Sequence, residues 1–397
     1  MKCNLDALVA GHICLDICPD LSRTADTTFQ EIFLPGHLVA AGPVACSAGG
    51  AVANIGLILH RLGITVGLAG KVGDDLFGQA VCQSISARAP GLGAEMILDA
   101  SVSTSYTIII NYPEVDRIFL HYPGANDTFQ PEDIPYALLT QARLFHFGYP
   151  PLMRSMFTDR GCRLAEIFRR AKGTGITTSL DMAFPDPSSE AAQADWRLIL
   201  ERTLPYVDIF LPSVEEILFM LHRDRYRELF AVSTGADLLA FVAPQLLSGL
   251  SRELIGMGAK IVGLKLGSRG MYLRTADRNV IASIGRARPS NPDAWAGAEL
   301  WAPCFNVMVA GTTGSGDATI AGFLAGLLRD LPIEQALRMA TAVGACNVEQ
   351  PDALSGIRSW EKTSRRLATG WEQLPLLLDA PGWQFDNSRG LWQGPYI

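Results

Sequence analysis

The chain has 397 residues, of which 48% are hydrophobic and 18% charged, and its formal net charge at pH 7 is −7. A chain with this apolar content can bury a large core, which excludes global disorder. Its length fits one large α/β domain with additions, or two average domains. The acidic balance argues against a general nucleic-acid binder.

The cysteines and the apolar stretches predict the cellular compartment of the protein. The eight cysteines are scattered and none forms a Cys-x-x-Cys pair, so we expect reduced thiols and a cytoplasmic protein. Asp6 interrupts the first apolar run, which makes this N-terminus a poor fit to an export signal. The most continuous apolar stretch, Ala318–Leu328, is about half of the roughly 20 residues that span a bilayer. We therefore expect no membrane partner.

Strand and helix patterns alternate from the start of the chain. In chain order we predict a strand at Leu5–Ala10, a helix at Ala51–Leu62, a strand at Thr65–Ala69 and a helix at Asp75–Ala87 that Asp74 could cap.

Two β-rich segments interrupt this alternation. A long insert, roughly residues 14–46, separates the first strand from the first helix. Ser105–Tyr112 and Arg117–Tyr122 read as the arms of a β-hairpin around a polar turn at residues 113–116. Since a parallel sheet needs neither segment, they predict a small separate sheet.

The alternation then becomes regular and favours a mostly parallel sheet buried on both faces. We predict strands at Arg143–Phe147, Gly175–Met182, Val207–Leu211, Lys260–Leu266 and Met271–Arg274, an irregular excursion at 287–303, and helices at Asp317–Leu328 and Ile333–Val348. Residues 366–397 show no firm pattern and are expected to form a tail packed on the body.

The loop at residues 311–317, Gly-Thr-Thr-Gly-Ser-Gly-Asp, leads directly into an apolar helix. Gly314 and Gly316 allow the backbone to turn tightly and to aim several N–H groups at one point. The helix N-terminus adds unpaired N–H groups and a positive dipole end. The pattern predicts an anion site, most naturally for phosphate.

Asp317 stands where a Walker A loop would have lysine, so a Walker A site is rejected. A carboxylate beside a phosphate site would serve as the base that removes the proton of an acceptor hydroxyl. It would equally serve as an ordinary helix cap. The residues alone do not decide between these alternatives.

A second Gly-rich segment opens the helix at Ala51–Leu62. Gly49 and Gly50 permit close approach of a ligand to the backbone, and Asn54 offers a donor and an acceptor one turn later. By itself this segment is more simply explained as a Gly-rich turn with a satisfied buried Asn54.

Taken together, these segments resemble the ribokinase (PfkB) family of carbohydrate kinases over roughly residues 5–358. The matching segments, in the family's order, are 48–54 with 62–63, Gly-x-x-Gly-x-Asp-x-x-Gly at 70–78, Gly-Ala-Asn at 124–126, the turn at 266–270 and 312–317. The form of 49–54 looks closer to fructokinase and 2-keto-3-deoxygluconate kinase relatives than to adenosine kinases.

The resemblance implies a ribokinase-like, doubly wound α/β domain over residues 1–365. A small β-sheet lid, from about 14–46 and 103–123, would close over the acceptor and exclude water. ATP would be the donor, with Mg²⁺, and the acceptor would be a hydroxyl of a sugar or sugar-like molecule. Because relatives often pair their lids, we expect a homodimer.

The resemblance also implies roles for individual residues. Asp317 would be the base, and Gly314, Ser315 and Gly316 would form the anion hole. Asp16, Gly49, Gly50 and Asn54 would contact the substrate. Glu216 would support Mg²⁺ and phosphate, although Ser213-x-x-Glu216 is also a capping box. The residues expected near the nucleotide are Ser213, Lys265, Gly267, Ser268, Gly270 and Thr341.

The sequence departs from the family pattern in three places. Gly311 replaces an acid that helps to form a monovalent-cation site in relatives, which puts activation by potassium in doubt. Ser213 replaces the usual asparagine. The segment 181–184, Asp-Met-Ala-Phe, differs from the Asp-x-Asn-x-Arg of many fructokinase-like members, so those substrate contacts do not transfer.

Three functions other than a sugar kinase are compatible with an α/β fold class. A nicotinamide dehydrogenase would need Gly-x-Gly-x-x-Gly after the first strand, but residues 11–16 read Gly-His-Ile-Cys-Leu-Asp. A nucleoside kinase of the same fold stays open. A catalytically silent sensor of a sugar or nucleoside also stays open, although Asp317 and the anion loop argue against it.

Overall fold

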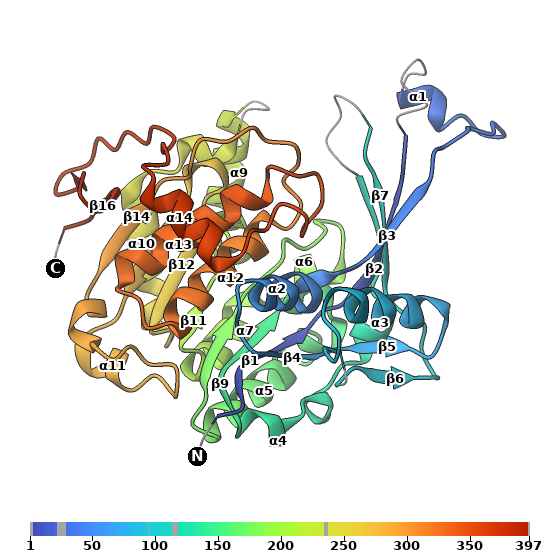
Figure 1. The fold of residues 1–397 in the computed structure, drawn as a ribbon, viewed down its shortest axis with the longest axis horizontal. Helices are drawn as coiled ribbons and strands as arrows, with labels where there is room; N and C mark the ends of the chain where they lie inside the picture. Colours follow the sequence, from blue (N-terminus) through green and yellow to red (C-terminus); the bar gives the residue numbers. More distant parts are fainter. Residues whose placement is uncertain (1–2, 22–28, 94, 113–117, 234–236, 396–397) are drawn as a thin grey trace.

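The computed structural model describes residues 3–21, 29–93, 95–112, 118–233 and 237–395. Within these residues one large sheet has ten strands (Figure 1). Their order is β15 (Gln384–Asp386), β16 (Leu391–Gln393), β14 (Glu299–Ala302), β13 (Met271–Thr275), β12 (Ile261–Lys265), β11 (Ile209–Phe210), β10 (Thr177–Leu180), β9 (Ala142–Gly148), β1 (Leu5–Gly11) and β4 (Val66–Ala69). Neighbouring strands from β4 to β12 are parallel, and those from β12 to β15 are antiparallel.

The main sheet is covered by helices on both faces, as predicted. Along β1, Ala7 and Val9 join one buried cluster and Leu8 and Ala10 the other, because successive side chains of a strand alternate. The helices of the first cluster include α2 (Gly50–Arg61), α3 (Leu76–Arg88), α11 (Arg278–Ala282), α12 (Ser315–Leu328) and α13 (Ile333–Asn347). Those of the second include α4 (Tyr136–Leu139), α5 (Cys162–Gly173), α6 (Glu190–Gln193), α7 (Trp196–Thr203), α8 (Val214–Leu221), α9 (Arg223–Ser233) and α10 (Pro244–Gly256).

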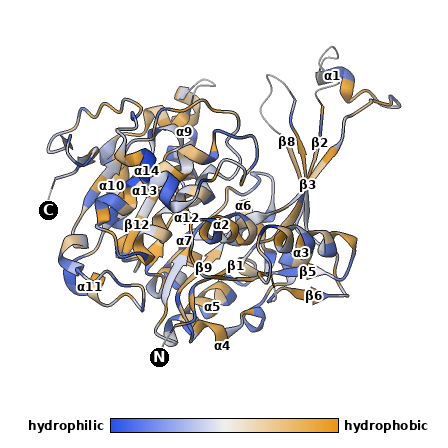
Figure 2. Ribbon diagram, in the orientation of Figure 1, coloured by the Kyte–Doolittle hydropathy of each residue, from blue (hydrophilic) through white to orange (hydrophobic). Residues whose placement is uncertain are grey.

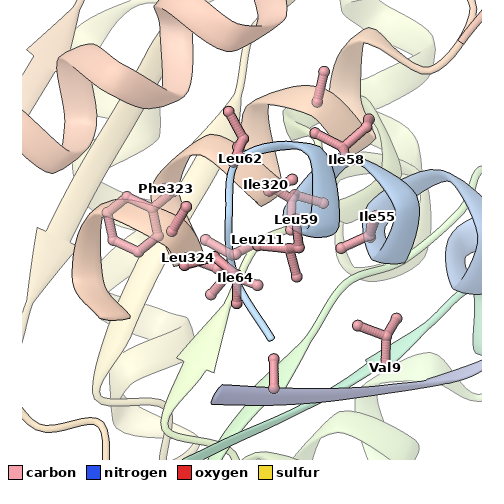
Figure 3. Close-up of a cluster of buried hydrophobic side chains, with 14 of the residues drawn as sticks. Val9, Ile55, Ile58, Leu59, Leu62, Ile64, Leu211, Ile320, Phe323 and Leu324 are labelled. Carbon is pink, nitrogen blue, oxygen red and sulfur yellow. The ribbon is translucent and has the colours of Figure 1, made fainter. Parts of the chain in front are cut away.

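Helices α2 and α12 pack together over the sheet. Figure 3 shows their apolar side chains in one cluster, and Figure 2 shows α2 as mostly hydrophobic. Gly322 lets α12 approach α13, because a Cβ there would lie 2.9 Å from the carbonyl oxygen of Met339. This packing places the N-terminal turns of α2 and α12 side by side. The cluster includes Ile55, Ile58, Leu59 and Leu62 with Ile320, Phe323 and Leu324.

A separate small sheet stands away from the body (Figure 1). Within the described part of the chain it has four strands, in the order β3 (Val44–Gly49), β2 (Cys14–Pro19), β7 (Tyr106–Ile110) and β8 (Ile118–Tyr122). The insert and the hairpin therefore form one sheet, as predicted, and α1 (Phe29–Ile32) lies at its outer end. Residues 22–28 and the predicted turn at 113–116 lie outside the described residues. Beside this sheet, β5 (Lys71–Gly73) and β6 (Ile97–Asp99) pair in parallel.

Three sequence predictions were wrong in detail. The cap of α3 is Asp75, whose side chain accepts a hydrogen bond from the backbone N–H of Gly78. The region 287–303 contains β14, which is fully inside the main sheet. The tail at 366–397 is more than a covering segment: α14 (Trp360–Ala368) ends within it, and β15 and β16 extend the sheet.

The last two of these misses share a physical cause. β14 and β16 are three or four residues long, too short for a period in the sequence to be seen. They exist because each pairs with a distant strand, as Trp301 does with Trp392.

No helix among the described residues is long and apolar enough to cross a membrane.

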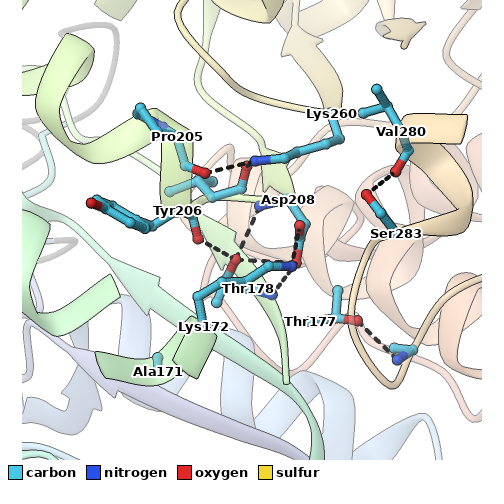
Figure 4. Close-up of polar contacts among 12 residues, drawn as sticks. Ala171, Lys172, Thr177, Thr178, Pro205, Tyr206, Asp208, Lys260, Val280 and Ser283 are labelled. Carbon is cyan, nitrogen blue, oxygen red and sulfur yellow. Dashed lines mark hydrogen bonds and ion pairs between the residues drawn. The ribbon is translucent and has the colours of Figure 1, made fainter. Parts of the chain in front are cut away.

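A buried ion pair ties the sheet together at the end where β11 begins (Figure 4). Asp208 is fully buried, and both of its carboxylate oxygens accept hydrogen bonds of 2.6 Å from the ammonium of Lys172. The backbone N–H of Thr178 donates a third bond of 3.0 Å. This network links α5, β10 and the start of β11.

We predict that Asp208→Ala lowers the free energy of unfolding by about 3 kcal/mol, because it leaves the Lys172 ammonium without its buried partner. Chemical denaturation measures the effect. Asp224→Ala is the matched control: its ion pair with Arg227 is exposed, so its effect should stay below about 0.5 kcal/mol. Equal effects would show that the Asp208 network adds no stability.

Candidate active site

The polar residues of the site follow directly after parallel strands. His12 follows β1, Tyr149 follows β9 and Asp181 follows β10. The carboxyl ends of parallel strands meet at one edge of a sheet, where ligands of open α/β folds bind. The N-terminal turns of α2 and α12 bring Asn54 and Asp317 to the same edge.

Asp317 lies in the first turn of α12, but it does not cap the helix. The N-cap residue is Gly314, whose φ of 72° is the left-handed conformation that glycine adopts without strain. The Asp317 carboxylate turns away from its own helix end. Its Oδ2 accepts a hydrogen bond of 2.8 Å from Asn54, and its Oδ1 accepts one of 2.6 Å from the hydroxyl of Tyr149. The capping alternative from the sequence is therefore wrong.

The surroundings of Asp317 make its carboxylate a weaker acid than usual. Burial and the nearby Asp181 raise the pKa of Asp317 to about 6, against the hydrogen bonds from Tyr149 and Asn54 and the charge of Lys265. Both hydrogen-bond donors are neutral, so neither forms an ion pair with it. The carboxylate is mostly ionised at pH 7 yet holds a proton more tightly than an exposed aspartate, as a general base requires.

A cavity of about 780 Å³ opens on one side of Asp317. Its lining includes Asp16, Gly50 and Asn54, which the sequence predicted for substrate. Gly49 lies against Asp16 instead, because a Cβ at 49 would clash with the Asp16 carboxylate. Burial raises the pKa of Asp16 to about 6. We call this space the acceptor cavity.

A second cavity, of about 540 Å³, opens on the other side of Asp317, and we call it the nucleotide cavity. The Lys265 ammonium lies beside the anion loop, since a Cβ built on Gly316 would lie 3.8 Å from it. The lining contains every residue that the sequence predicted for this side: Ser213, Glu216, Lys265, Gly267, Ser268, Gly270, Thr341, Gly314, Ser315 and Gly316.

Glu216 has the capping role that the sequence allowed, and its side chain also reaches the nucleotide cavity. It forms the capping box of α8, in which its Oε2 accepts a hydrogen bond of 2.7 Å from the backbone N–H of Ser213. It also lines the nucleotide cavity. Burial raises the pKa of Glu216, while Lys265 opposes that rise. Among the described residues, no group of three or more His, Cys, Asp or Glu side chains is placed to hold a metal ion.

The two cavities meet at the site of the expected chemistry. Tyr149, Phe184, Gly314 and Asp317 line both of them. A hydroxyl in the acceptor cavity and a phosphate at the start of α12 would therefore both reach the same carboxylate.

Sequence reasoning missed several residues of the acceptor cavity. Tyr149 holds Asp317, as described above. His12 lies 3.4 Å from His121 of the small sheet, between their Nε2 atoms, and Thr107 lies 3.0 Å from His121 Nδ1. A search for polar residues within two positions of the ends of the predicted strands would have found His12 and Tyr149. His121 becomes part of the cavity only through the pairing of β7 with β8.

Gly311, which replaces the family's acid, is closely packed. A Cβ there would lie 2.8 Å from the Cα of Pro351 and 2.9 Å from its carbonyl oxygen. The backbone N–H of Gly311 donates to the carbonyl of Val348 at 3.3 Å. An aspartate at 311 therefore lacks room unless this backbone moves.

Comparisons with known proteins identify relatives of this chain. The family model for the pfkB family carbohydrate kinases matches residues 13–360. An uncharacterized sugar kinase of Archaeoglobus fulgidus is 27% identical over 75% of this chain and 97% of its own. Fructokinase-2 of Oryza sativa subsp. japonica is 24% identical over 87% of this chain and 89% of its own. The structure of Arabidopsis thaliana ribokinase complexed with ribose and ATP superposes with a TM-score of 0.65 at 17% identity, covering 92% of this chain and 99% of that one.

The fold is ribokinase-like, and the family match and the curated relatives define the class of protein as a carbohydrate kinase phosphotransferase. The chain belongs to the pfkB family of carbohydrate kinases.

We predict that Tyr149→Phe moves the acid limb of the kcat/KM profile to higher pH by about one pH unit. In the native protein the hydrogen bond from Tyr149 lowers the pKa of Asp317, so its removal raises that pKa. The base must be ionised to act, so activity rises as pH increases through its pKa. Tyr136→Phe is the control, since that ring lies under Arg170 and outside both cavities. An unmoved acid limb would mean that Asp317 does not control the profile.

Proposed function

We propose that this protein transfers the γ-phosphoryl group of ATP, with Mg²⁺, to a hydroxyl of a neutral sugar or sugar-like acceptor. The observation that carries the proposal is the buried Asp317 carboxylate at the junction of the two cavities. The similarity to fructokinases and to a ribokinase complexed with ribose and ATP supports both the donor and the class of acceptor.

The residues of this chain would divide the reaction between them. Asp317 takes the proton of the acceptor hydroxyl, whose oxygen forms the new bond to the γ-phosphorus while the bond to ADP breaks. The first N–H groups of α12, at residues 314–316, and the Lys265 ammonium face the negative charge of the transferring group. Tyr149 and Asn54 hold the carboxylate in place.

Mg²⁺ would neutralise phosphate charge when bound with ATP. Glu216 fits that role, because its buried carboxylate lines the nucleotide cavity. Magnesium usually uses one or two protein carboxylates together with substrate phosphates, so a single acid is chemically sufficient.

The charge of the acceptor cavity favours a neutral acceptor. Its described lining carries carboxylates at Asp16, Asp127, Asp186, Glu190 and Asp317, against one arginine, Arg154. That arginine already pairs with Glu190 at 2.7 Å. A sugar phosphate or a sugar acid would meet net repulsion, whereas hydroxyl groups can donate hydrogen bonds to these carboxylates.

A screen of ATP consumption tests this proposal. The panel holds neutral pentoses and hexoses, nucleosides, 2-keto-3-deoxygluconate and sugar phosphates, with the Asp317→Asn protein as the blank. We expect turnover on neutral sugars above the anionic compounds. Turnover confined to nucleosides would identify the alternative nucleoside kinase. ATP and sugar binding without turnover would indicate a sensor.

The small sheet serves, in this proposal, as a lid that closes over the acceptor and excludes water. Two observations support this: Asp16, Thr107 and His121 of the sheet line the acceptor cavity, and the sheet otherwise stands apart from the body (Figure 1). Its exposed Phe119 and Leu120 suit pairing with a second copy, so a homodimer through the lid is part of the proposal.

We predict that Asp317→Asn folds but loses about 10²–10⁴-fold in kcat, the effect of removing a general base. The pKa of Asp317 in the folded protein, about 6, exceeds its ordinary value of 3.8. Its contribution to stability is thus fully present below pH 3.8 and is lost as pH rises through 6. At pH 7 the variant should therefore melt no lower than the wild type. Near-normal kcat would exclude Asp317 as the base.

We predict that potassium does not activate this kinase specifically, because Gly311 supplies no carboxylate for a cation. Turnover with saturating Mg-ATP is compared in potassium and in sodium at equal ionic strength. Gly311→Asp should lower the melting temperature rather than create a potassium response, because its Cβ meets the Pro351 backbone. A large potassium-specific rise in kcat of the wild type would contradict the prediction.

A further inference from the structure

The segment after the family match contributes to the nucleotide cavity. The match to the pfkB family ends at residue 360, yet Leu374 lines this cavity. Leu374 is half-buried, whereas Leu377, a little further along the chain, is 89% exposed. One leucine of this segment therefore faces the cavity while another faces solvent.

The segment is held in place by the backbone. The N–H of Leu374 donates to the carbonyl of Cys304 at 2.8 Å, and the N–H of Asn306 donates to the carbonyl of Glu372 at 2.8 Å. Phe305 and Gln373 form an antiparallel bridge between these bonds. Since Cys304 and Phe305 also line the nucleotide cavity, residues 372–374 add an outer strand-like layer to its wall.

Side-chain contacts also hold residues 371–374 in place. The indole of Trp371 stacks on Phe305, with ring centroids 4.6 Å apart, and its N–H donates to the carbonyl of Asn306 at 3.0 Å. The guanidinium of Arg366 lies 3.5 Å from the centre of the Trp371 ring and pairs with Glu349. The position of Leu374 is thus determined by packing on both sides.

The chemistry of the lining divides the cavity into two parts. Lys265 and the anion loop at 314–316 offer charge and N–H groups, which suit phosphates. The wall near Gly267 is apolar: Leu239 lies within 3.0 Å of a Cβ built there, and Cys304 donates a hydrogen bond to the carbonyl of Gly267 at 3.2 Å. Leu239, Phe305, Val307 and Leu374 together form this apolar part.

We propose that residues 371–374 form a wall of the nucleotide site, with Leu374 in contact with the adenine base of ATP or ADP. The adenine base is the uncharged, flat end of these molecules, and an apolar wall binds it by removing surface from water. This inference rests on the proposed function, because it takes the second cavity as the site of ATP.

Calorimetric titration of the full chain with ADP and Mg²⁺ tests the proposal, and it needs no acceptor. We expect Leu374→Ala to weaken ADP binding by about 3-fold to 10-fold, since tenfold corresponds to about 1.4 kcal/mol of lost apolar contact. Leu377→Ala removes the same atoms from an exposed position of the same segment and should leave the dissociation constant unchanged.

Leu374→Val guards against a folding defect, because it removes a single methylene and keeps a side chain suited to an extended segment; we expect an intermediate loss, of about 2-fold. Melting curves confirm that each variant is folded. Unchanged ADP binding in both Leu374 variants, with a wild type that binds ADP, would overturn the wall and leave the kinase proposal intact. A wild type that binds neither ADP nor ATP would instead overturn the proposed function.

Discussion

Burial of one carboxylate is the constraint on which the rest of the site depends. The Asp317 side chain loses its water and receives hydrogen bonds from the neutral groups of Asn54 and Tyr149 rather than from a cation. A carboxylate stabilised in this way stays a good proton acceptor, whereas an ion pair would have lowered its pKa. This arrangement requires accurate placement of α2, α12 and β9. The apolar contacts between α2 and α12 fix the positions of these two helices (Figure 3).

The two cavities beside the Asp317 carboxylate differ in the charge of their linings. The nucleotide side has Lys265 and the N-terminal turn of α12, which favour phosphate. The acceptor side has Asp16, Asp127 and Glu190, which favour hydroxyl donors and disfavour a second anion. A molecule with a polyphosphate would therefore be directed to the nucleotide cavity and a neutral polyol to the acceptor cavity. Asp317 lines both cavities.

The antiparallel half of the sheet explains how residues far along the chain reach the nucleotide cavity. β13 and β14 extend the parallel strands, and β16 pairs with β14 through Trp301 and Trp392. The chain between α14 and β15 then runs past Cys304 and Phe305, where Leu374 is added to the lining. The C-terminal strands thus connect the edge of the sheet to the wall of a cavity.

The sequence by itself determined the features that arise from short-range patterns. Apolar runs such as Leu5–Ala10 predicted the parallel strands, and the glycines around Asp317 predicted an anion loop at a helix start, because both depend on neighbouring residues. Only the tertiary structure decided that Asp317 bonds Tyr149 and Asn54, that His121 meets His12 across more than a hundred residues, and that β14 and β16 pair at all. Each of these contacts joins segments whose approach is set by packing of the whole core, and a local pattern carries no information about that approach.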